Sequence, residues 1–326
     1  MLELVRELRS DDIETVVVND GSTVGLEIFP ELERLGAVVL HHQANRGMGG
    51  ALKTGFAYMS EHGFDGVVAA DADGQHTPED IRRVAEALTQ HSGELVLGAR
   101  DVSQMPRRSK MGNSITRMMF NLLYGIKLQD TQTGLRGMLF TKDSIPGLLR
   151  LPSDRYDYQM EVLVESGRLF PKGIVEVPIQ TIYIDNNRSS HFRVLQDSIK
   201  IYSILLCHLP RFMASSLLAF AVDYGLFNLL YYLVLRRSVP ATVLARLVSC
   251  TVNYTVNKRI VFRGSGRTYN VWNYIKLAAG ILIANSLLIY LLVDRMGLPA
   301  FIMKILVECL LYLVSFAVQN QLASKA

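Results

Sequence analysis

Closely spaced cysteines are missing from this sequence. Its three cysteines, Cys207, Cys250 and Cys309, lie in or beside apolar segments, where a free thiol behaves as a small hydrophobic group. A structural zinc site or a disulfide framework needs cysteines that are grouped along the chain, and these are not. We therefore expect neither zinc nor a disulfide.

A strong charge of one sign is also missing. The 326 residues carry a formal net charge of only +4, which is small for this length. Proteins that bind nucleic acids display a much larger basic surface, so the charge gives no reason to expect a nucleic-acid partner. Local clusters of basic residues are therefore more informative than the total.

The start of the chain lacks the pattern of a secretory signal peptide. The run Met-Leu-Glu-Leu-Val-Arg-Glu-Leu has neither a basic leading region nor a continuous apolar stretch. We expect the first half of the chain to stay in the cytoplasm, with later helices delivering it to the membrane.

The distribution of apolar residues predicts two domains, 1–205 and 206–326. Up to about Tyr202 the sequence is mixed and charged, as in a soluble α/β protein. Beyond Leu209 long apolar runs dominate, and charged residues retreat to short connecting segments.

The first domain alternates strand and helix patterns. Apolar, β-branched runs at 15–19, 37–41 and 66–70 indicate buried strands, and helical patterns occupy 49–62 and 78–91. This alternation predicts an α/β fold with a parallel, doubly wound sheet, which binds its ligands at the carboxyl ends of the strands.

The second domain contains four apolar segments, each near the ~20 residues that span a bilayer. We expect an all-α transmembrane domain of four helices, over 212–235, 239–257, 271–293 and 298–318. The loop 258–267 carries more basic residues than the other connections, so the positive-inside rule places it in the cytoplasm with both termini.

Two carboxylates directly follow the third predicted strand. Asp71 and Asp73 are two positions apart and therefore project from the same side of the strand end. This geometry suits Mg2+ or Mn2+, which would neutralise the charge of a departing nucleotide diphosphate. Taken alone, an Asp-x-Asp turn is also common as a solvated loop.

Three polar segments follow one another along the chain: Val16–Ser22, Asn45–Ala51 and Asp71–His76. Together they resemble glycosyltransferase family 2, whose nucleotide-sugar-dependent fold is called GT-A, and within it the dolichol- or undecaprenyl-phosphate sugar synthases. The resemblance implies an α/β GT-A catalytic domain that binds a nucleotide-sugar with Mg2+ or Mn2+.

The resemblance also implies roles for individual residues. It places Asp20 at the base or ribose of the nucleotide, and Asp71 with Asp73 at the metal and the diphosphate. The implied nucleotide-sugar set is Asp20, Gly21, Ser22, Asn45, Gly47, Gly49, Asp71 and Gln75, and the implied metal set is Asp71, Asp73 and Gln75. The glycines would also form a tight turn into a helix without any ligand, and we expect both interpretations to hold.

Basic residues follow a predicted strand at 94–98, and a run of this kind is often only a solvated face. Here a phosphate substrate is expected, and Arg can bind phosphate through two parallel hydrogen bonds. We assign to the acceptor phosphate or the diphosphate Arg100, Arg107, Arg108, Arg188, His191 and Arg193. The last three lie in a segment that resembles a mobile loop closing over the diphosphate in these synthases.

Two further segments resemble acidic motifs of the family. Asp130–Gly137 resembles its second acidic motif, so Asp130 would contact sugar hydroxyls or hold an Arg, and Tyr156–Glu161 resembles a helix start that supplies a carboxylate near the sugar. The implied catalytic set is Asp71, Asp73, Asp130, Arg136 and Glu161.

A phosphate acceptor would need no general base. A phosphomonoester is largely an oxyanion near neutral pH, since its second pKa is about 6. Catalysis would then depend on positioning and on stabilising the leaving diphosphate, and direct attack would invert the anomeric configuration. The expected reaction transfers a sugar from a UDP- or GDP-sugar to polyprenyl phosphate at the cytoplasmic membrane face, for cell-envelope or glycoconjugate glycosylation.

The last third resembles the GtrA-like family of small four-helix membrane proteins associated with lipid-linked sugars. The segments that carry the resemblance are Arg211–Ala214, Val222–Leu230 and Val252–Phe262. Asp223, Arg246, Lys276, Lys304 and Glu308 lie in or near the spans, where charge is costly and therefore indicates function by default. The two lysines could instead reach the interface by snorkelling.

One departure from the family concerns its first strand. Members normally begin with an extra strand that helps to clasp the base, and this sequence starts after the point where that strand should be. We expect either a misassigned start codon or an incomplete sheet edge and nucleoside pocket. Met48, where a Lys is common, is a milder departure.

Two alternatives remain open at this point. A processive polysaccharide synthase would resemble its relatives in a Gln-x-x-Arg-Trp motif, but the single Trp, Trp272, is not preceded by Arg. A non-enzymatic membrane module with a degenerate catalytic half would bind or translocate a lipid-linked sugar. A homo-oligomer is left open.

Overall fold

A computed structural model describes the chain except for residues 143, 183–193, 236–237, 264–267 and 325–326. The chain forms two compact units. The first consists of Met1–Asn121 and Ile126–Leu205, and the second of Leu122–Gly125 and Leu206–Ala326.

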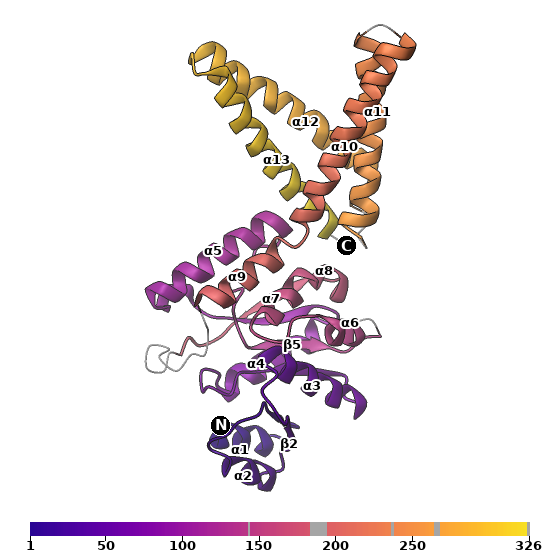
Figure 1. The fold of residues 1–326 in the computed structure, drawn as a ribbon. Coiled ribbons are helices and arrows are strands. Elements are labelled where there is room, and N and C mark those ends of the chain that lie inside the picture. Colours follow the sequence, from indigo (N-terminus) through magenta and orange to yellow (C-terminus); the bar gives the residue numbers. More distant parts are fainter. Residues whose placement is uncertain (143, 183–193, 236–237, 264–267, 325–326) are drawn as a thin grey trace. The chain divides into compact units, whose positions relative to one another are not determined.

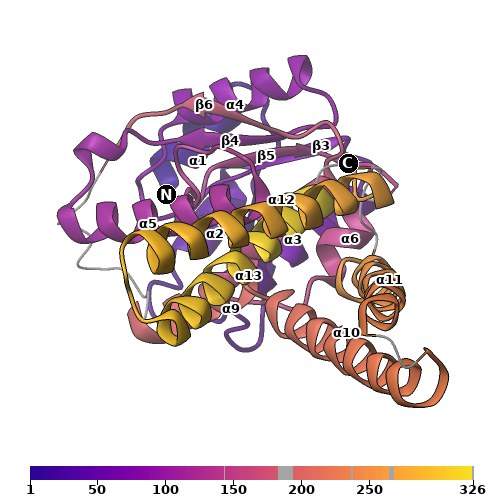
Figure 2. The ribbon, with the colours of Figure 1, turned by 90° about the horizontal axis from the view of Figure 1, so that it is seen from above.

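The strands of the first unit form two sheets. Strands β1 (Val16–Asn19) and β2 (Val38–His41) pair in parallel and make a two-stranded sheet. The second sheet has the order β3-β5-β4-β6, which Figure 2 shows from above. Its strands are β3 (Gly66–Ala69), β4 (Leu95–Ala99), β5 (Arg136–Leu139) and β6 (Ile174–Pro178).

The expectation of an entirely parallel sheet is wrong for β5. This strand runs antiparallel to both β3 and β4, whereas β4 and β6 are parallel. The preceding loop explains the direction, because Asp130 binds Arg100, just after β4, and Gly134 lies against Asp71, just after β3. The chain thus enters β5 from the edge at which β3 and β4 end.

Helices cover these sheets. In chain order they are α1 (Leu2–Ser10), α2 (Ile28–Arg34), α3 (Met48–Glu61), α4 (Pro78–Gln90), α5 (Arg107–Tyr124), α6 (Ser144–Arg150), α7 (Asp157–Val164), α8 (Ser166–Leu169) and α9 (Val194–Leu205), with a short 3-10 turn, η1 (Val102–Gln104), before α5. Helix α4 begins as its sequence predicts, with the Thr77 side chain accepting from the Asp80 N–H at 3.2 Å. Its buried face, with Val84 and Leu88, packs in one core with Val96 of β4.

The two sheets are not joined to each other. Among the described strands, β1 pairs only with β2, and β3 pairs only with β5. Helix α3 packs against both β1 and β3, so one helix covers parts of both sheets. The side chains of β1 and β3 are mostly half-buried, whereas those of β4 are fully buried. The expected first strand stays a prediction.

The second unit is helical. Its elements are α10 (Leu209–Leu229), η3 (Leu230–Leu235), α11 (Ser238–Val256), η4 (Asn257–Val261), α12 (Val271–Ile289), η5 (Tyr290–Arg295) and α13 (Ala300–Ser324), where the η elements are π-helical. Figure 1 shows α10 beside α11 and α12 beside α13, in agreement with the contacts between them.

Three helical segments of the described residues are long and apolar enough to cross a membrane: Leu209–Leu229, Val271–Leu292 and Ile305–Ser324. Apolar side chains on these segments are largely exposed, as expected for helices that face lipid. The fourth expected span, 239–257, falls on α11 and stays a prediction.

Candidate active site

Asp20 directly follows β1 and holds the loop of the next motif. Its carboxylate accepts hydrogen bonds from the backbone N–H groups of Arg46 at 2.8 Å and Gly47 at 2.7 Å, and from His42 Nδ1 at 2.7 Å. Burial raises the pKa of Asp20, but these hydrogen bonds outweigh burial and lower the pKa below the ordinary 3.8. Asp20 is therefore an ionised anchor that ties this loop to the end of β1.

The glycines of the first two motifs are required by close approach of the chain. A Cβ at Gly21, whose φ is +73°, would lie 2.6 Å from the backbone nitrogen of Asn45. A Cβ at Gly47, with φ +91°, or at Gly49 would lie 2.5 Å from an atom of segment 154–158. The expected tight turn into α3 is confirmed, and a contact of these residues with nucleotide stays a prediction.

Asp71 and Asp73 leave the end of β3 beside a buried histidine. Burial and the negative charge of Asp73 raise the pKa of Asp71, against the opposing effect of His76. Burial likewise lowers the pKa of His76, which favours its neutral ring. Among the described residues, His76 Nδ1 is buried without a hydrogen-bond partner, so the site contains an unpaired polar atom next to two carboxylates.

Asp130 is fully buried and holds an arginine. Its carboxylate accepts from Arg100 Nε at 2.6 Å and from Asn113 Nδ2 at 3.2 Å, and its own N–H donates to Glu176 at 3.0 Å. Of the two roles expected for Asp130, the structure shows the one in which it holds an Arg.

Arg136 begins β5 and is buried beneath this loop. It donates to the carbonyl oxygens of Thr133 at 3.0 Å and Gln159 at 2.7 Å. Burial lowers the pKa of Arg136 to about 10, so the side chain remains protonated at neutral pH. These contacts tie the acidic loop to α7 through a buried positive charge.

Tyr156 directly precedes α7, and Glu161 lies within this helix. Glu161 accepts from the backbone N–H of Ser153 at 3.0 Å and so fixes the segment that contacts Gly47 and Gly49. Burial and the negative charge of Asp71 raise the pKa of the half-buried Tyr156 phenol.

The remaining assigned residues are only partly described. The N–H of Gln75 donates to Asp73 Oδ1 at 3.0 Å, and the N–H of Ser22 donates to Asn19 Oδ1 at 2.9 Å. Arg107 and Arg108 begin α5, but their side chains lie outside the described part of the structure. Three assigned residues lie entirely outside it, Arg188, His191 and Arg193.

The donor set at the end of β3 fits a cation that arrives with a diphosphate. Among the described residues, no three His, Cys, Asp or Glu side chains are grouped closely enough to hold a metal ion. Asp71 and Asp73 supply carboxylate oxygens, the ligands preferred by Mg2+ and Mn2+, and such ions commonly complete their coordination with phosphate oxygens. These two carboxylates thus fit an ion shared with the substrate, which Asp71 and Asp73 would hold.

Sequence reasoning missed several residues that build this site. His42 bonds Asp20, Asn113 and Glu176 bond the Asp130 loop, and Lys53 Nζ bonds Leu151 O at 2.6 Å. His42 was detectable, because it directly follows β2 at a carboxyl strand end. Asn113 lies inside a long helix and gave no local signal.

Two family profiles match the chain. Residues 1–143 match "Glycosyl transferase family 2", and residues 211–323 match "GtrA/DPMS, transmembrane domain".

Curated relatives cover most of the first half. A UDP-N-acetylglucosamine–dolichyl-phosphate N-acetylglucosaminyltransferase of Methanococcus voltae is 34% identical over 177 residues, which are 52% of this chain and 68% of the relative. An undecaprenyl-phosphate mannosyltransferase of Micrococcus luteus is 32% identical over 174 residues, 51% of this chain and 70% of the relative.

Among solved structures, glucosyl-3-phosphoglycerate synthase from Mycobacterium tuberculosis, crystallised with Mn2+, UDP-glucose and phosphoglyceric acid, matches with a TM-score of 0.47 and 19% identity. The match covers 63% of this chain and 74% of that one.

The structure agrees with both profiles and with the curated relatives. It has a polar site at the carboxyl ends of β1 and β3, and apolar helices long enough to span a bilayer. The chain belongs to glycosyl transferase family 2 and is a membrane glycosyltransferase with a GtrA/DPMS transmembrane domain.

Proposed function

We propose that this enzyme transfers a sugar from a UDP- or GDP-sugar to a polyprenyl phosphate, undecaprenyl or dolichyl, at the cytoplasmic face of the membrane. The observation that carries the proposal is the group of Asp71, Asp73 and His76 at a sheet edge, in a chain that also contains bilayer-length helices. The names of the two curated relatives support a polyprenyl-phosphate acceptor, and the name of the first supports a UDP-sugar donor.

In the proposed reaction, an oxygen of the acceptor phosphate attacks the anomeric carbon of the sugar. The bond from that carbon to the diphosphate oxygen breaks on the opposite side, so the configuration inverts and the nucleoside diphosphate leaves. Asp71 and Asp73 would hold Mg2+ or Mn2+, and the bound ion would neutralise charge on the leaving group. The acceptor is already an oxyanion, so no side chain must remove a proton.

The surrounding residues position these groups. Asp20 fixes the loop that contains Asn45, Gly47 and Gly49, and this loop with Gly21 and Ser22 forms the proposed nucleotide side of the site. Asp130 holds Arg100, and Arg136 holds α7. Glu161 holds the segment before α7. Arg100 with Arg107, Arg108, Arg188, His191 and Arg193 supplies the positive charge for the phosphate groups.

The membrane part is proposed to present the lipid acceptor. We place the domain boundary between residues 205 and 206, four spans in the membrane, and both termini in the cytoplasm. The second unit contains an ion pair, Arg246 with Asp223 at 3.5 Å, in which the Arg246 side chain is exposed, and Asp223 also accepts from Ser249 Oγ at 2.9 Å. Charged groups in a span favour contact with a polar lipid headgroup.

A direct assay tests the proposal. The full chain in lipid nanodiscs is mixed with Mn2+, radiolabelled UDP-GlcNAc, UDP-glucose or GDP-mannose, and undecaprenyl or dolichyl phosphate. We expect one donor to give a labelled product that extracts into organic solvent, with free nucleoside diphosphate in equal amount. Nucleotide release without labelled lipid, or no product from any pair, would contradict the proposed reaction.

A further inference from the structure

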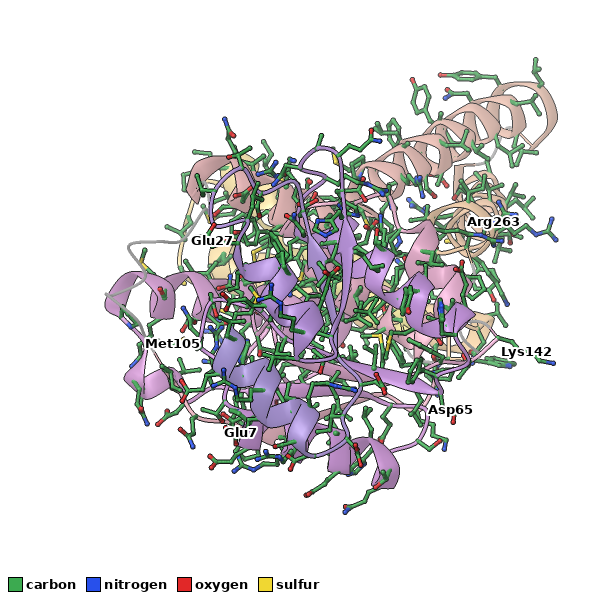
Figure 3. All side chains as sticks on the ribbon, turned by 90° about the horizontal axis from the view of Figure 1, so that it is seen from below. Glu7, Glu27, Asp65, Met105, Lys142 and Arg263 are labelled. Atoms are coloured by element: carbon green, nitrogen blue, oxygen red, sulfur yellow. The ribbon has the colours of Figure 1, made fainter. Side chains whose placement is uncertain are left out.

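The register of β3 and β5 sets a glycine opposite the first carboxylate of the proposed cation site. Strand β3 starts directly after Asp65, which Figure 3 labels, and ends at Ala69. Ala69 is paired with Arg136 in the antiparallel ladder. Two residues farther along one strand and two residues back along the other, the same register places Asp71 opposite Gly134. Residues that are directly opposite in an antiparallel pair share one face of the sheet and lie side by side.

The Asp71 carboxylate occupies the space that a side chain at position 134 would need. A Cβ at Gly134 would lie 2.6 Å from Asp71 Cγ and 3.0 Å from Oδ1, and closer still to Oδ2. Non-bonded carbon atoms in contact are normally about 3.5–4.0 Å apart, so even a methyl group does not fit. The φ of Gly134 is not positive. The glycine is therefore required for space and not for a left-handed backbone.

The loop on either side of this glycine is held in place. Thr133 and Leu135 are both 0% exposed. The carbonyl oxygen of Leu135 accepts from the Gly98 N–H of β4 at 2.9 Å, and that of Thr133 accepts from Arg136 Nε at 3.0 Å. If a methyl group were added to the glycine, the loop could not move back, so the Asp71 side chain would have to rotate away.

We propose that Gly134 is a positioning residue for the cation at the end of β3. Because it has no side chain, the Asp71 carboxylate can lie against the loop in one orientation, in which it supplies oxygen ligands together with Asp73. Gly134 itself touches neither the ion nor a substrate and acts only through Asp71. The inference rests on the proposed function for the ion and its diphosphate. Groups that orient a metal ligand typically contribute about 10- to 100-fold to metal affinity.

Binding of Mn2+ to the full chain in nanodiscs tests the inference without sugar transfer. Free Mn2+ is measured by its electron paramagnetic resonance signal, with and without UDP. We expect Gly134→Ala to weaken Mn2+ binding roughly 10- to 100-fold. The midpoint of thermal unfolding without metal should change by no more than a few degrees, because rotation of one side chain accommodates the methyl group. Unchanged Mn2+ affinity in the folded variant would overturn the inference.

A double variant shows whether the effect passes through Asp71. Asp71→Ala removes the three atoms that the new methyl group would meet, so adding Gly134→Ala to it should cause no further loss of Mn2+ affinity. If Gly134→Ala alone does not fold, the double variant should fold, because the clash is gone. Gly137→Ala is the matched control, since its Cβ would meet Val84 and Leu88 of α4 at 2.8 and 3.0 Å. It should lower thermal stability and leave Mn2+ affinity unchanged.

An additive loss in the double variant, a double variant that fails to fold, or an equal loss of Mn2+ affinity in Gly137→Ala would overturn the inference and leave Gly134 with a packing role only.

The structure of Gly134→Ala, determined without metal, provides a readout that is independent of the reaction. We expect the Asp71 side chain to be rotated while residues 133–136 keep their places. A displaced loop with Asp71 unmoved would overturn the inference. A wild-type chain that binds no Mn2+ with UDP would overturn the cation site and this inference together, whereas a wild type that binds Mn2+ but transfers no sugar would contradict the proposed function alone.

Discussion

At the scale of single residues, the two carboxylate motifs of this enzyme have opposite electrostatics. Asp20 is surrounded by donors, and hydrogen bonds lower its pKa although burial opposes them. Asp71 is close to another carboxylate, and burial raises its pKa. The first arrangement stabilises the fold with a negative charge, whereas the second keeps an unfavourable negative charge where a cation would relieve it.

These opposite shifts predict opposite effects on stability. Ionised Asp20 contributes stability that is present above the ordinary pKa of 3.8 and is lost as pH falls through its lower folded pKa. Ionised Asp71 costs stability at neutral pH, and this cost disappears as pH falls through its raised pKa. At pH 7 we expect Asp20→Ala to destabilise the protein by about 1–3 kcal/mol and Asp71→Asn to stabilise it.

Denaturant unfolding without added metal measures both changes, with Asp65→Asn at an exposed position as control. A loss of stability in Asp71→Asn under those conditions would contradict the charge argument.

Asp73 provides the corresponding functional prediction. Its side chain is exposed, so Asp73→Asn should leave the fold intact while removing a carboxylate from the proposed cation site. We expect transfer to fall at least about 100-fold, with unchanged thermal unfolding in the absence of ligand. Asp101→Asn, in the exposed turn before α5, is the control. Full turnover of Asp73→Asn at saturating Mn2+ would argue against a role in binding the ion.

At the scale of elements, the sequence predicted those features that depend on residues close together along the chain. The three first strands, the Thr77 cap of α4 and the glycine turn before α3 lie where residue types predict them. The direction of β5 was not predictable, because it depends on where the loop around Asp130 and Gly134 is held by residues far away in sequence. The role of Asn113 was missed for the same reason, because its contact with the Asp130 loop depends on non-local packing.

The separation of the two sheets leads to a prediction about β1 and β3. Each of these strands has one edge without a strand partner in the described structure, although α3 packs against both. One additional strand between them would join the sheets and add a wall to the nucleotide side of the site.

We expect an N-terminally extended form, read from upstream in-frame codons where they exist, to bind a UDP- or GDP-sugar roughly 10- to several-hundred-fold more tightly, because one or two contacts to the base contribute about 1–3 kcal/mol. Calorimetric titration of both forms measures this, and equal dissociation constants would show that the site is complete without the strand.

At the scale of the whole molecule, the composition of the chain changes close to the point at which the structure divides. The change near Leu209 separates charged α/β sequence from apolar helices, and the structure forms compact units that divide at Leu205. Composition could not predict that residues 122–125, at the end of α5, belong with the helical unit. Within that unit Asn320 and Gln321 donate to the carbonyl oxygens of Leu123 and Leu122, and as ordinary polar residues in a long apolar helix they reveal these partners only in three dimensions.

The division of labour between the units leads to the last prediction. A chain truncated after Tyr202 keeps the strands, the carboxylate site and most of α9, and we expect it to remain soluble and to bind the nucleotide-sugar. It loses the helices that are proposed to present the lipid, so the defect should depend on the length of the acceptor. Transfer to a short, water-soluble prenyl phosphate should change little, whereas transfer to a long-chain acceptor in membranes should fall by roughly 10-fold or more, since the acceptor is no longer concentrated at the catalytic unit. Rates for both acceptors are compared between the truncated and full chains. An equal loss for both acceptors would assign the whole effect to the catalytic domain and would remove lipid presentation from the role of the membrane helices.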